Sequence, residues 1–587
     1  MKTKWHVRHR LKTKDQSGRL EKLLEVLLAN RGISPAGHAA FLHPPHPDTI
    51  NLTDLGVDPN QLKRAVELLL GLSPGGWRAK GPRSSARTPS ELTSRGGGRR
   101  SGVEPDKTPT TVVIYGDYDA DGITATAILY ESLTAAGIKV WPFIPDRQKH
   151  GYGLSKPGLQ EVIKKHHPQL IITVDNGITA IDATKFAQKH GIKVIIIDHH
   201  QPFPGKHPAD AVIHSTLASG AGLAWLFSRY LSQQLNLNLN TTNTLELAAI
   251  GTVADMVPLI GANRSLAAHG LIKLQTTARP GIKHLIQIAG INQSEIDTHH
   301  LGFHLAPRLN ASGRLENAMD SLRLLCTTDP GRAARLAQDL NRTNLLRQDL
   351  TESLFKIASD LVDSADKPHP IVVARLDFHE GVIGLVAGKL AQQFWRPAVV
   401  ISQGKIFSKA SARSIPGFNI IDVLRKIDKL MESCGGHPQA AGFSIRTEKI
   451  AKFVDKFTKI SRPLLTPDIL SRTLNIDAEI NFSDISPQLL DVQNLLKPTG
   501  IGNPSPTFST DNLIINDLKT VGRDAKHLRL LLNQDGVQFS AIGFGLGNLA
   551  ASLSPNQSVS AAYTPFISTW NGDNKIELKL KDLKLKT

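Results

Sequence analysis

The feature that most constrains this chain is a group of acidic residues that directly follows a short apolar segment. The run VVIYGDYDADGITATAIL carries Asp117, Asp119 and Asp121 at alternate positions, after β-branched residues and before a helical pattern. Carboxylates at this spacing repel one another unless a positive charge lies among them, and Mg²⁺ or Mn²⁺ prefers such hard oxygen ligands. A solvated acidic turn explains this run alone equally well, because Asp-Gly and Asp-Ala pairs also mark loops.

Two later segments repeat the same arrangement. LIITVDNGIT places Asp175 after a second apolar run, and VIIIDHHQP places Asp198, His199 and His200 after a third. Continuous β-branched runs separated by helical patterns are typical of strands buried on both faces of a parallel sheet. Ligands of open α/β sheets bind beyond the carboxyl ends of the strands, so the three groups should meet at one edge. Asp255, in GTVADMVPL, is a candidate further ligand.

The composition limits the class of protein. At 587 residues the chain is too long for one hydrophobic core, and about three to four domains are expected. No segment approaches the ~20 apolar residues of a membrane span. The basic N-terminus, MKTKWHVRHRLKTK, leads into no apolar signal region. The two cysteines, Cys326 and Cys434, form no disulfide framework and no zinc motif, which favours a reducing cytoplasm.

The chain carries a large positive charge. Its 69 lysines and arginines against 52 acidic residues give a formal net charge of +17. Such a charge attracts polyanions and speeds their encounter with the protein, so it favours a nucleic-acid partner. A basic surface without a specific partner is the alternative.

Changes in pattern divide the chain into six segments. Residues 1–72 show apolar positions at helical spacing, and residues 73–108 are rich in Gly, Ser, Pro and Arg, which predicts a disordered basic linker. An α/β domain is expected at 109–275, a helical connector at 276–365, a second α/β domain at 366–462 and a region of short strands at 463–587.

The expected fold class is therefore α/β with an added all-β domain. Across 327–362, leucines and one isoleucine recur at intervals of three, four and, once, six residues. This spacing predicts one long helix that connects the parallel-sheet domain to the smaller α/β domain. The short C-terminal strands suggest a small barrel or sandwich. A barrel of the OB type, which holds single-stranded nucleic acid, would fit the net charge.

The acidic groups suit a particular chemistry. Two divalent cations ~3.5–4 Å apart can stabilise both the attacking and the leaving oxygen of a phosphoryl displacement. Such a pair needs several carboxylates, at least one of them bridging, and usually a histidine. The chain supplies this set as Asp119, Asp121, Asp175, His199 and Asp255.

The motifs also carry a family resemblance. DHH, together with GDYDADG, VDNGI and GTVADMVPL, resembles the DHH phosphoesterase superfamily. GFHLAPRLNASGRL, FHEGVIGLVAGKL, SKASARSIPGFN, GGHPQAAGF and PTGIGNPSPTF narrow the resemblance to its RecJ family, over nearly everything outside 73–108. It implies a 5′→3′ exonuclease that degrades single-stranded DNA to mononucleotides with Mn²⁺ or Mg²⁺, in DNA repair and recombination. Single-strand-binding protein and a helicase are the partners that it implies.

The resemblance assigns roles to the acidic motifs. The metal ligands would be Asp119, Asp121, Asp175, His199 and Asp255. His200 would orient the site or contact the scissile phosphate. Asp117 and Asp198 would buttress the ligands through hydrogen bonds.

The second α/β domain resembles the DHHA1 domain. His437, in GGH, would face the metals across a cleft, although a glycine turn with a surface histidine explains GGH without the resemblance. Ser411 and Arg413 resemble residues that hold the terminal 5′ phosphate, a task that suits the forked donors of arginine. Arg147 and Arg308 would contact phosphates as well, whereas a surface salt bridge is the commoner role of an isolated arginine.

Two departures from the family pattern stand out. The linker at 73–108 is longer than usual, and His214-Ser215 with a shortened loop replaces an Asn-Pro segment beside the expected cleft. Two other functions compete with the exonuclease. One is a DHH hydrolase of short oligonucleotides or cyclic dinucleotides, whose members generally lack a C-terminal β-domain. The other is a DNA-binding relative with impaired catalysis, against which the intact acidic set argues.

Overall fold

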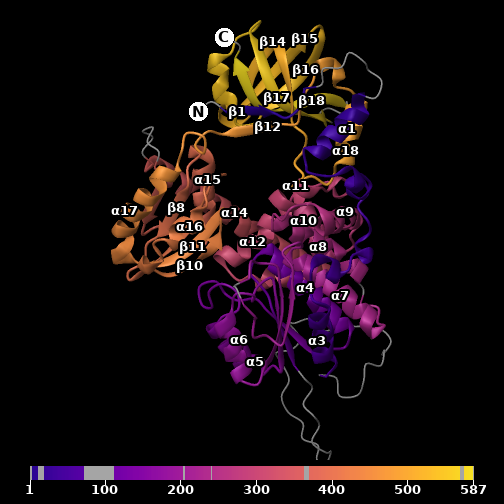
Figure 1. The fold of residues 1–587 in the computed structure, drawn as a ribbon, viewed down its shortest axis with the longest axis vertical. Helices are drawn as coiled ribbons and strands as arrows, with labels where there is room; N and C mark the ends of the chain where they lie inside the picture. Colours follow the sequence, from indigo (N-terminus) through magenta and orange to yellow (C-terminus); the bar gives the residue numbers. More distant parts are fainter. Residues whose placement is uncertain are drawn as a thin grey trace, which may run out of the picture. The chain divides into compact units, whose positions relative to one another are not determined.

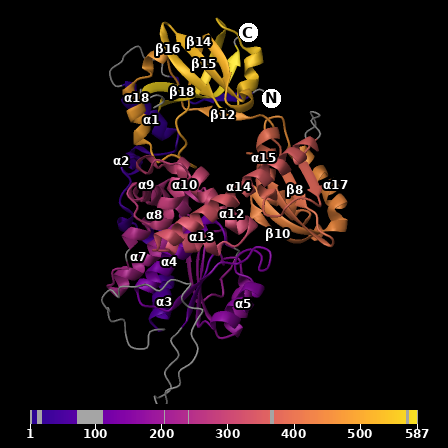
Figure 2. The ribbon, with the colours of Figure 1, turned by 180° about the vertical axis from the view of Figure 1, so that it is seen from behind.

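The computed structural model of the chain describes residues 3–10, 19–71, 111–202, 205–239, 241–362, 369–568 and 574–585. These residues form two compact units. The first unit comprises residues 1–42, 348–497 and 504–587, and the second comprises 43–347 and 498–503. Figures 1 and 2 show the elements of both units from opposite sides. The predicted linker at 73–108 lies outside the described residues.

The second unit is built on a parallel sheet of five strands. Its order is β3-β2-β4-β5-β6, and every neighbouring pair is parallel. The strands are β2 (Val112–Tyr115), β3 (Val140–Phe143), β4 (Leu170–Val174), β5 (Lys193–Asp198) and β6 (Ala211–His214). The residues of β2 and β4 are all buried, which explains why these runs are apolar without alternation. The predicted parallel α/β domain is confirmed.

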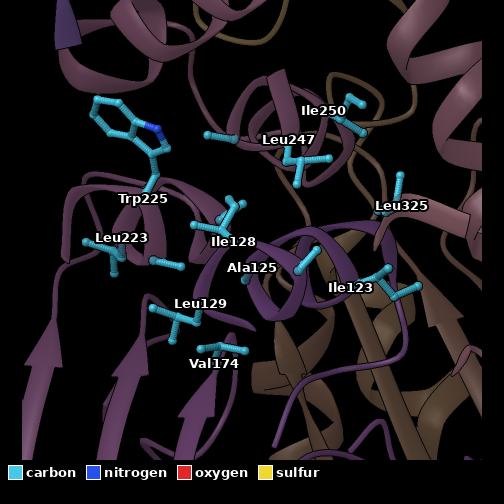
Figure 3. Packing of buried hydrophobic residues seen from close by; sticks show 14 of the residues in the cluster. Ile123, Ala125, Ile128, Leu129, Val174, Leu223, Trp225, Leu247, Ile250 and Leu325 are labelled. Carbon is cyan, nitrogen blue, oxygen red and sulfur yellow. The ribbon is translucent and has the colours of Figure 1, made fainter. Parts of the chain in front are cut away.

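Helices cover both faces of this sheet (Figure 1). Ile114, Ile172 and Ile195 face one core, and Val113, Ile171 and Val194 face the other. The helices are α3 (Pro59–Leu70), α4 (Ala120–Ala135), α5 (Lys156–His166), α6 (Ile181–Lys189), α7 (Gly220–Leu235), α8 (Thr241–Ala254) and α9 (Gly261–Gln275). The α4, α7 and α8 side supplies the larger core. There Trp225 and Leu223 of α7 pack near Ile128 of α4 and Leu247 of α8 (Figure 3).

A helical region follows the sheet. Its elements are α10 (Pro280–Ile288), α11 (Thr298–His300), the π-helix η6 (Leu301–Leu305), α12 (Ala306–Leu315), α13 (Met319–Cys326) and α14 (Pro330–Asp360). Asp329 caps α14 by accepting a hydrogen bond from Arg332 N at 2.7 Å, and Pro330 opens the helix. The predicted long connecting helix is confirmed, and it runs from the second unit into the first.

A short segment from near the C-terminus completes the second unit. Residues 498–503 dock on it although the chain on either side belongs to the first unit. Leu259 N donates to Ile501 O at 2.7 Å, and buried Arg264 donates through Nη1 to Pro498 O at 3.0 Å. A Cβ on Gly500 would lie 2.7 Å from Leu259 Cδ1, so the close approach requires glycine. The segment thereby holds the loop that follows Asp255.

The first unit contains a mixed sheet of five strands in the order β10-β11-β9-β8-β7. Only β7 and β8 are parallel. The strands are β7 (Ile371–Arg375), β8 (Ala398–Ser402), β9 (Phe407–Arg413), β10 (Met431–His437) and β11 (Ala440–Arg446). The helices are α15 (Ile383–Phe394), α16 (Ile420–Arg425) and α17 (Ile450–Ser461).

The first unit also contains the predicted barrel. Six strands have the order β13-β14-β15-β16-β18-β17, and a further β14–β17 pairing closes the sheet. The strands are β13 (Ala478–Glu479), β14 (Phe508–Val521), β15 (His527–Gln534), β16 (Val537–Gly543), β17 (Ser558–Ser568) and β18 (Lys575–Leu585), and α18 (Pro487–Leu495) precedes β14. Leucines 528, 530 and 532 of β15 point inward at every second position. The predicted OB-like domain is confirmed.

The N-terminal segment differs from the purely helical one predicted for 1–72. Strand β1 (Lys4–Val7) pairs in parallel with β12 (Thr473–Ile476), and α1 (Arg19–Ala29) adds Leu23 and Leu27 to the core of the barrel. From His43 onward the segment belongs to the second unit, after α2 (His38–Leu42). Four residues carry too little periodicity to indicate a strand, and the partner of β1 is remote in sequence.

Among the described residues, none of the helices combines the length and apolarity needed to cross a membrane.

Packing of α8 against α9 yields a stability prediction. A Cβ on Gly270 would lie 2.3 Å from Ala249 Cβ and 2.8 Å from Leu245 O, so Gly270→Ala must push the two helices apart. We expect a loss of about 1–3 kcal/mol, the usual cost of overpacking a core. Gly37→Ala is the control, since its Cβ would meet no atom closer than 3.4 Å. Urea unfolding would contradict the prediction if both variants had the midpoint of the unsubstituted chain.

Candidate metal centre

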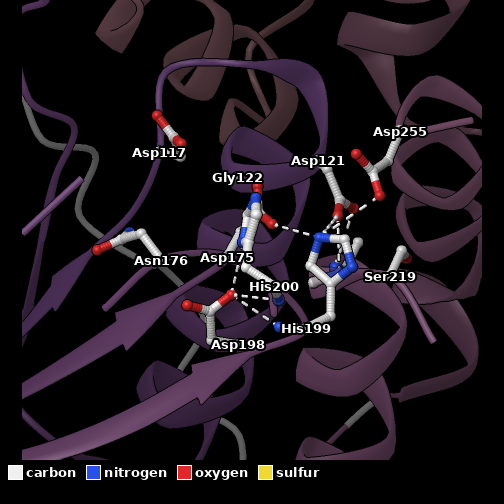
Figure 4. A network of polar contacts seen from close by, with 12 residues as sticks. Asp117, Asp121, Gly122, Asp175, Asn176, Asp198, His199, His200, Ser219 and Asp255 are labelled. Carbon is white, nitrogen blue, oxygen red and sulfur yellow. Dashed lines mark hydrogen bonds and ion pairs between the residues drawn. The ribbon is translucent and has the colours of Figure 1, made fainter. Parts of the chain in front are cut away.

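The acidic motifs meet at one edge of the parallel sheet. Asp117 and Asp119 follow β2, Asp175 follows β4, and Asp198 ends β5 with His199 directly behind it. Because β2, β4 and β5 are adjacent and parallel, their carboxyl ends lie side by side. Figure 4 shows the side chains of Asp175, Asp198 and His199 converging there.

The turn between β2 and α4 is fixed by its own carboxylates. Asp119 is the N-cap of α4, where its Oδ1 accepts from Asp121 N at 3.1 Å and Gly122 N at 3.0 Å. Asp117 Oδ1 accepts from Tyr118 N at 2.6 Å. A Cβ on Gly122 would lie 2.6 Å from Asp117 Cβ, so the turn closes this tightly only with glycine.

Asp121 is held by the beginning of another helix. Its carboxylate accepts from Gly220 N at 2.7 Å and from Ala221 N at 2.9 Å, the first amides of α7. These donors and the positive end of the helix suit a buried carboxylate. A Cβ on Gly220 would lie 2.6 Å from Asp175 Cβ, and one on Gly251 would lie 2.4 Å from Asp121 Oδ1. Both glycines leave room for the acidic side chains.

His199 lies at the centre of the carboxylates. Its Nε2 is 3.1 Å from Asp175 Oδ1, 3.4 Å from Asp255 Oδ2 and 3.9 Å from Asp121 Oδ2. Asp255 follows the last turn of α8, so the fourth motif reaches the same pocket from a helix rather than from a strand. Asp175 has φ +61°, a left-handed conformation that aspartate and asparagine tolerate best among residues with a side chain.

His200 is oriented by Asp198. Its Nδ1 lies 2.7 Å from Asp198 Oδ1, which also accepts from His199 N at 2.7 Å and His200 N at 3.1 Å, while Ile178 N donates to Oδ2 at 2.9 Å. Burial disfavours charge on both groups, but their mutual hydrogen bond and attraction raise the pKa of His200 to about 9 and lower that of Asp198. The pair therefore holds a proton between its members.

Four other carboxyls of the pocket have raised pKa values, in contrast to Asp198. Burial, and then repulsion by neighbouring carboxylates, raises the pKa of Asp121 to about 7, Asp117 to about 8 and Asp255 to about 9, and that of Asp175 well above its usual range. A multivalent cation stabilises such a pocket strongly, because it attracts the ionised oxygens of several carboxylates at the same time.

The donor set fits divalent cations. Three groups have ligand atoms within 4.8 Å of one another: Asp175 with His199 and His200, Asp121 with His199 and Asp255, and Asp117 with Asp119 and Asp175. Carboxylate oxygens and imidazole nitrogens are ligands suited to Mn²⁺ and Mg²⁺. Asp175 belongs to two of these groups, as a bridging ligand would. The structure thus brings together the five residues predicted to bind metal, and their roles remain a proposal.

Helix α12 forms one wall of the pocket. Asn310 Oδ1 accepts from Ala120 N at 2.6 Å, and a Cβ on Gly313 would lie 2.5 Å from Tyr118 O. Sequence reasoning used only Arg308 from the motif APRLNASGRL, so the role of Asn310 was missed. Arg308 donates to Asn341 Oδ1 at 3.0 Å and to His304 O at 2.7 Å.

Two further contacts surround the DHH motif. Exposed Tyr152, in the motif GYGL, places its hydroxyl 3.2 Å from His200 Nε2. The sequence indicated the nearby Arg147 but did not identify Tyr152. The guanidinium of Arg147 lies 5.6 Å from the ring centre of Tyr118. His214, one of the departures from the family pattern, has Nε2 2.7 Å from His200 O. His214 thereby connects the end of β6 to the last residue of the DHH motif, His200.

The other predicted residues belong to the first unit. Ser411 and Arg413 lie on β9, and Arg413 Nη1 donates to Ser411 Oγ at 3.1 Å. A Cβ on Gly384, in the first turn of α15, would lie 3.0 Å from both Ser411 Oγ and Arg413 Nη2. A serine hydroxyl, a guanidinium and a helix N-terminus thus meet at one point. His437 ends β10 and is exposed, and its predicted place opposite the metals remains a prediction.

Comparisons with known proteins agree with this arrangement. Three family descriptions match: "DHH family, N-terminal domain" at residues 111–252, "DHHA1 domain" at 369–462 and "RecJ OB domain" at 476–582. The chain is 35% identical to the single-stranded-DNA-specific exonuclease RecJ of Bacillus subtilis over 80% of its own length but only 61% of that protein's. It is 33% identical to RecJ of Haemophilus influenzae over 81% of its own length and 88% of that protein's.

A solved structure is similar along the whole chain. The Mn²⁺ complex of RecJ from Thermus thermophilus aligns with a TM-score of 0.78 at 28% identity, over 100% of this chain and 80% of that one.

The raised pKa values predict how stability depends on pH without metal. Folded pKa values above the unfolded value of 3.8 mean that the folded chain binds more protons than the unfolded chain up to about pH 9. The pocket therefore stabilises the fold at low pH, and this contribution is lost as pH rises. Asp175→Asn removes one such carboxyl without straining its backbone. We expect its melting temperature in EDTA at about pH 8 to exceed that of the unsubstituted chain.

Added Mn²⁺ should reverse that order. The unsubstituted chain should gain melting temperature with Mn²⁺, and the variant should gain little, because it lacks the shared ligand. Exposed Asp455, in the middle of α17, gives the control Asp455→Asn, which should follow the unsubstituted chain in both conditions. A lower melting temperature for Asp175→Asn in EDTA would contradict the expected repulsion.

Proposed function

The chain belongs to the RecJ family, and from this premise we propose that it is a metal-dependent 5′→3′ exonuclease that degrades single-stranded DNA to mononucleotides. The observation that carries the proposal is the pocket in which acidic groups from three strand ends and one helix end surround His199, with Asp175 shared between two ligand groups. Since the B. subtilis relative is matched over only 61% of its length, the activity of the whole protein is proposed rather than transferred.

The metal ligands that we propose are Asp119, Asp121, Asp175, His199 and Asp255. RecJ of T. thermophilus has been solved with Mn²⁺ and with Mg²⁺, and the carboxylates and imidazole here suit either ion. Two such ions would stabilise the attacking and leaving oxygens of phosphodiester hydrolysis.

The protein's own groups supply orientation. Asp198 fixes the ring of His200 through Nδ1, so that Nε2 is directed toward Tyr152 Oη. We propose that Nε2 donates to a phosphate oxygen of the substrate. The amides of α7 keep Asp121 in place, and Asn310 holds the first turn of α4. Each of these bonds limits the motion of a ligand and thereby lowers the cost of reaching the reactive geometry.

The first unit offers a site for the 5′ end. Arg413, Ser411 and the N-terminal turn of α15 together present a charged fork, a hydroxyl and backbone amides, the donors that bind a phosphate monoester. We propose that they hold the terminal 5′ phosphate. Arg147 and Arg308 are proposed as further phosphate contacts and His437 as a residue near the scissile bond.

The barrel distinguishes this proposal from its alternatives. Hydrolysis of very short oligonucleotides or cyclic dinucleotides has no need for an OB domain, and the chain matches the RecJ OB domain over residues 476–582. Such a barrel can bind a single strand through its backbone charge and base stacking, without reading sequence. The complete acidic set argues against a DNA-binding relative without catalysis.

The setting of the activity is also a proposal. Degradation of single strands from a 5′ end would serve DNA repair and recombination. A cytoplasmic location agrees with two cysteines that are both free. Single-strand-binding protein and a helicase stay predicted partners.

A cleavage assay tests the function. A single strand with a 5′ phosphate and a 3′ label should lose nucleotides stepwise with Mn²⁺, while the blunt duplex of the same sequence persists. Asp175→Asn should lower the cleavage rate by more than about a hundredfold, since it removes a proposed metal ligand and not merely a residue that hydrogen-bonds to one. Shortening from the 3′ end, hydrolysis restricted to very short oligomers, or near-normal turnover in the variant would each contradict the proposal.

The phosphate site has its own test. Arg413→Ala should reduce the preference for a 5′-phosphorylated over a 5′-hydroxyl strand by about ten- to a hundredfold in kcat/KM, as expected for lost hydrogen bonds to a charged group. Lys409→Ala is a matched control on the same strand, β9, and should keep the preference. An equal loss on both substrates would indicate that Arg413 acts on structure alone.

A further inference from the structure

A row of aromatic and basic side chains lies on the helical run Thr298–Leu315. This run comprises α11, the π-helix η6 and α12. Phe303 is 72% exposed, an unusual state for a phenylalanine in a folded domain. Its ring stacks on that of His299, with centroids 4.8 Å apart and an angle of 26° between the planes. The stacked pair presents an aromatic surface to solvent.

Two further imidazoles extend the row. The ring of His304 lies 5.6 Å from that of His299 and 5.7 Å from that of His300. His300 is paired with Asp297 at 2.7 Å. These histidines are absent from the metal-ligand groups of the described residues, so the cluster is better suited to stacking than to metal binding.

Arg308 brings positive charge to the same row. Its guanidinium donates to His304 O at 2.7 Å and to Asn341 Oδ1 at 3.0 Å, both of which are neutral oxygens. Among the described residues no ion pair neutralises Arg308. Burial and then the nearby charges of His299, His300 and Arg308 lower the pKa of His304, which agrees with a positive local field. A phosphate placed beside a stacked base would meet this charge.

Neighbours of the row on the same helical run contact elements that carry the acidic pocket. A Cβ on Gly302 would lie 3.9 Å from Val253 Cγ1, two residues before the proposed ligand Asp255. At the other end, Asn310 bonds to Ala120 N next to Asp119. The intervening turn is π-helical, a conformation that is frequent at functional sites. The helical run that carries the row therefore contacts α8, which precedes Asp255, and α4, whose N-cap is Asp119.

We propose that Phe303 and His299, flanked by His300, His304 and Arg308, form a stacking platform for nucleotides that extend beyond the scissile phosphodiester. The proposal rests on the exonuclease function and adds a specific subsite to it. The platform binds bases through their faces, so it is indifferent to sequence, and Arg308 binds the adjoining phosphate. Its contribution grows with strand length until the strand reaches it.

Kinetics on strands of increasing length test the platform. Phe303→Leu keeps an apolar side chain of similar size but loses the aromatic face, and Phe303→Trp keeps that face. We expect Phe303→Leu to raise KM for long single strands by roughly five- to a hundredfold, the range for loss of one base–aromatic stack, with little change in kcat. A 5′-phosphorylated dinucleotide should show a much smaller effect. Phe303→Trp should retain the KM of the unsubstituted chain.

A binding measurement makes the test independent of cleavage. A strand with 2-aminopurine at successive positions is bound in EDTA, where hydrolysis is halted. Stacking on Phe303 should quench its fluorescence at one position, and Phe303→Leu should abolish that quenching. Ile272→Ala, an exposed apolar residue of α9, is the matched control and should change neither reading.

The outcomes separate the two proposals. If the unsubstituted chain degrades single strands but Phe303→Leu has the same KM at every length, the platform is refuted and the exonuclease stands. An equal loss on dinucleotide and long strand would also refute it, because that pattern indicates a structural role. If the unsubstituted chain cleaves no strand, the exonuclease function fails, and the quenching profile still decides whether the platform binds bases.

Discussion

Mutual repulsion of buried carboxylates is the constraint on which the second unit is built. Asp117, Asp121 and Asp175 are almost fully buried, at 1–2% exposure, and they share one pocket with Asp255. Such a group is costly in a protein interior unless cations or directed donors compensate it. The parallel sheet brings the acidic side chains to one edge, and the amides of α7 donate hydrogen bonds to Asp121. The glycines at 220 and 251 leave room for the carboxylates. Each of these three features allows the acidic side chains to lie close together.

The net charge of the chain and the charge of the acidic pocket have opposite signs. A formal charge of +17 draws a polyanion toward the protein, whereas the pocket itself would repel it. Divalent cations bound as proposed would add positive charge to the pocket and weaken this repulsion. They would thereby favour the approach of the proposed substrate. The pair of His200 and Asp198 keeps a proton donor at the same place.

Much of this arrangement could be predicted from the sequence, because its signals are local. Each strand that carries a ligand is a continuous apolar run with its ligand at the carboxyl end, and the periodicity of α14 extends along the whole helix. The contacts that were missed join remote positions. Asn310 reaches Ala120 across 190 residues, and β1 pairs with β12 near the opposite end of the chain. No pattern within a short window contains such information.

The role of His214 shows another limit. Its position was noted as a departure from the family pattern, yet its bond to the carbonyl oxygen of His200 depends on the parallel register of β5 and β6, which places Asp198 opposite His214. Sequence identifies the substitution, and only the register explains how histidine replaces the usual connection.

Residues 498–503 have a consequence for how the protein is made. They complete the second unit by bonding to Leu259, Arg264 and Thr298, yet they follow those partners by some two hundred residues or more. During translation the ribosome must deliver residues 498–503 before the second unit is complete. Until then Arg264 lacks the carbonyl that receives its buried guanidinium. A nascent chain that lacks residues 498–503 therefore cannot complete the packing around the loop that follows Asp255.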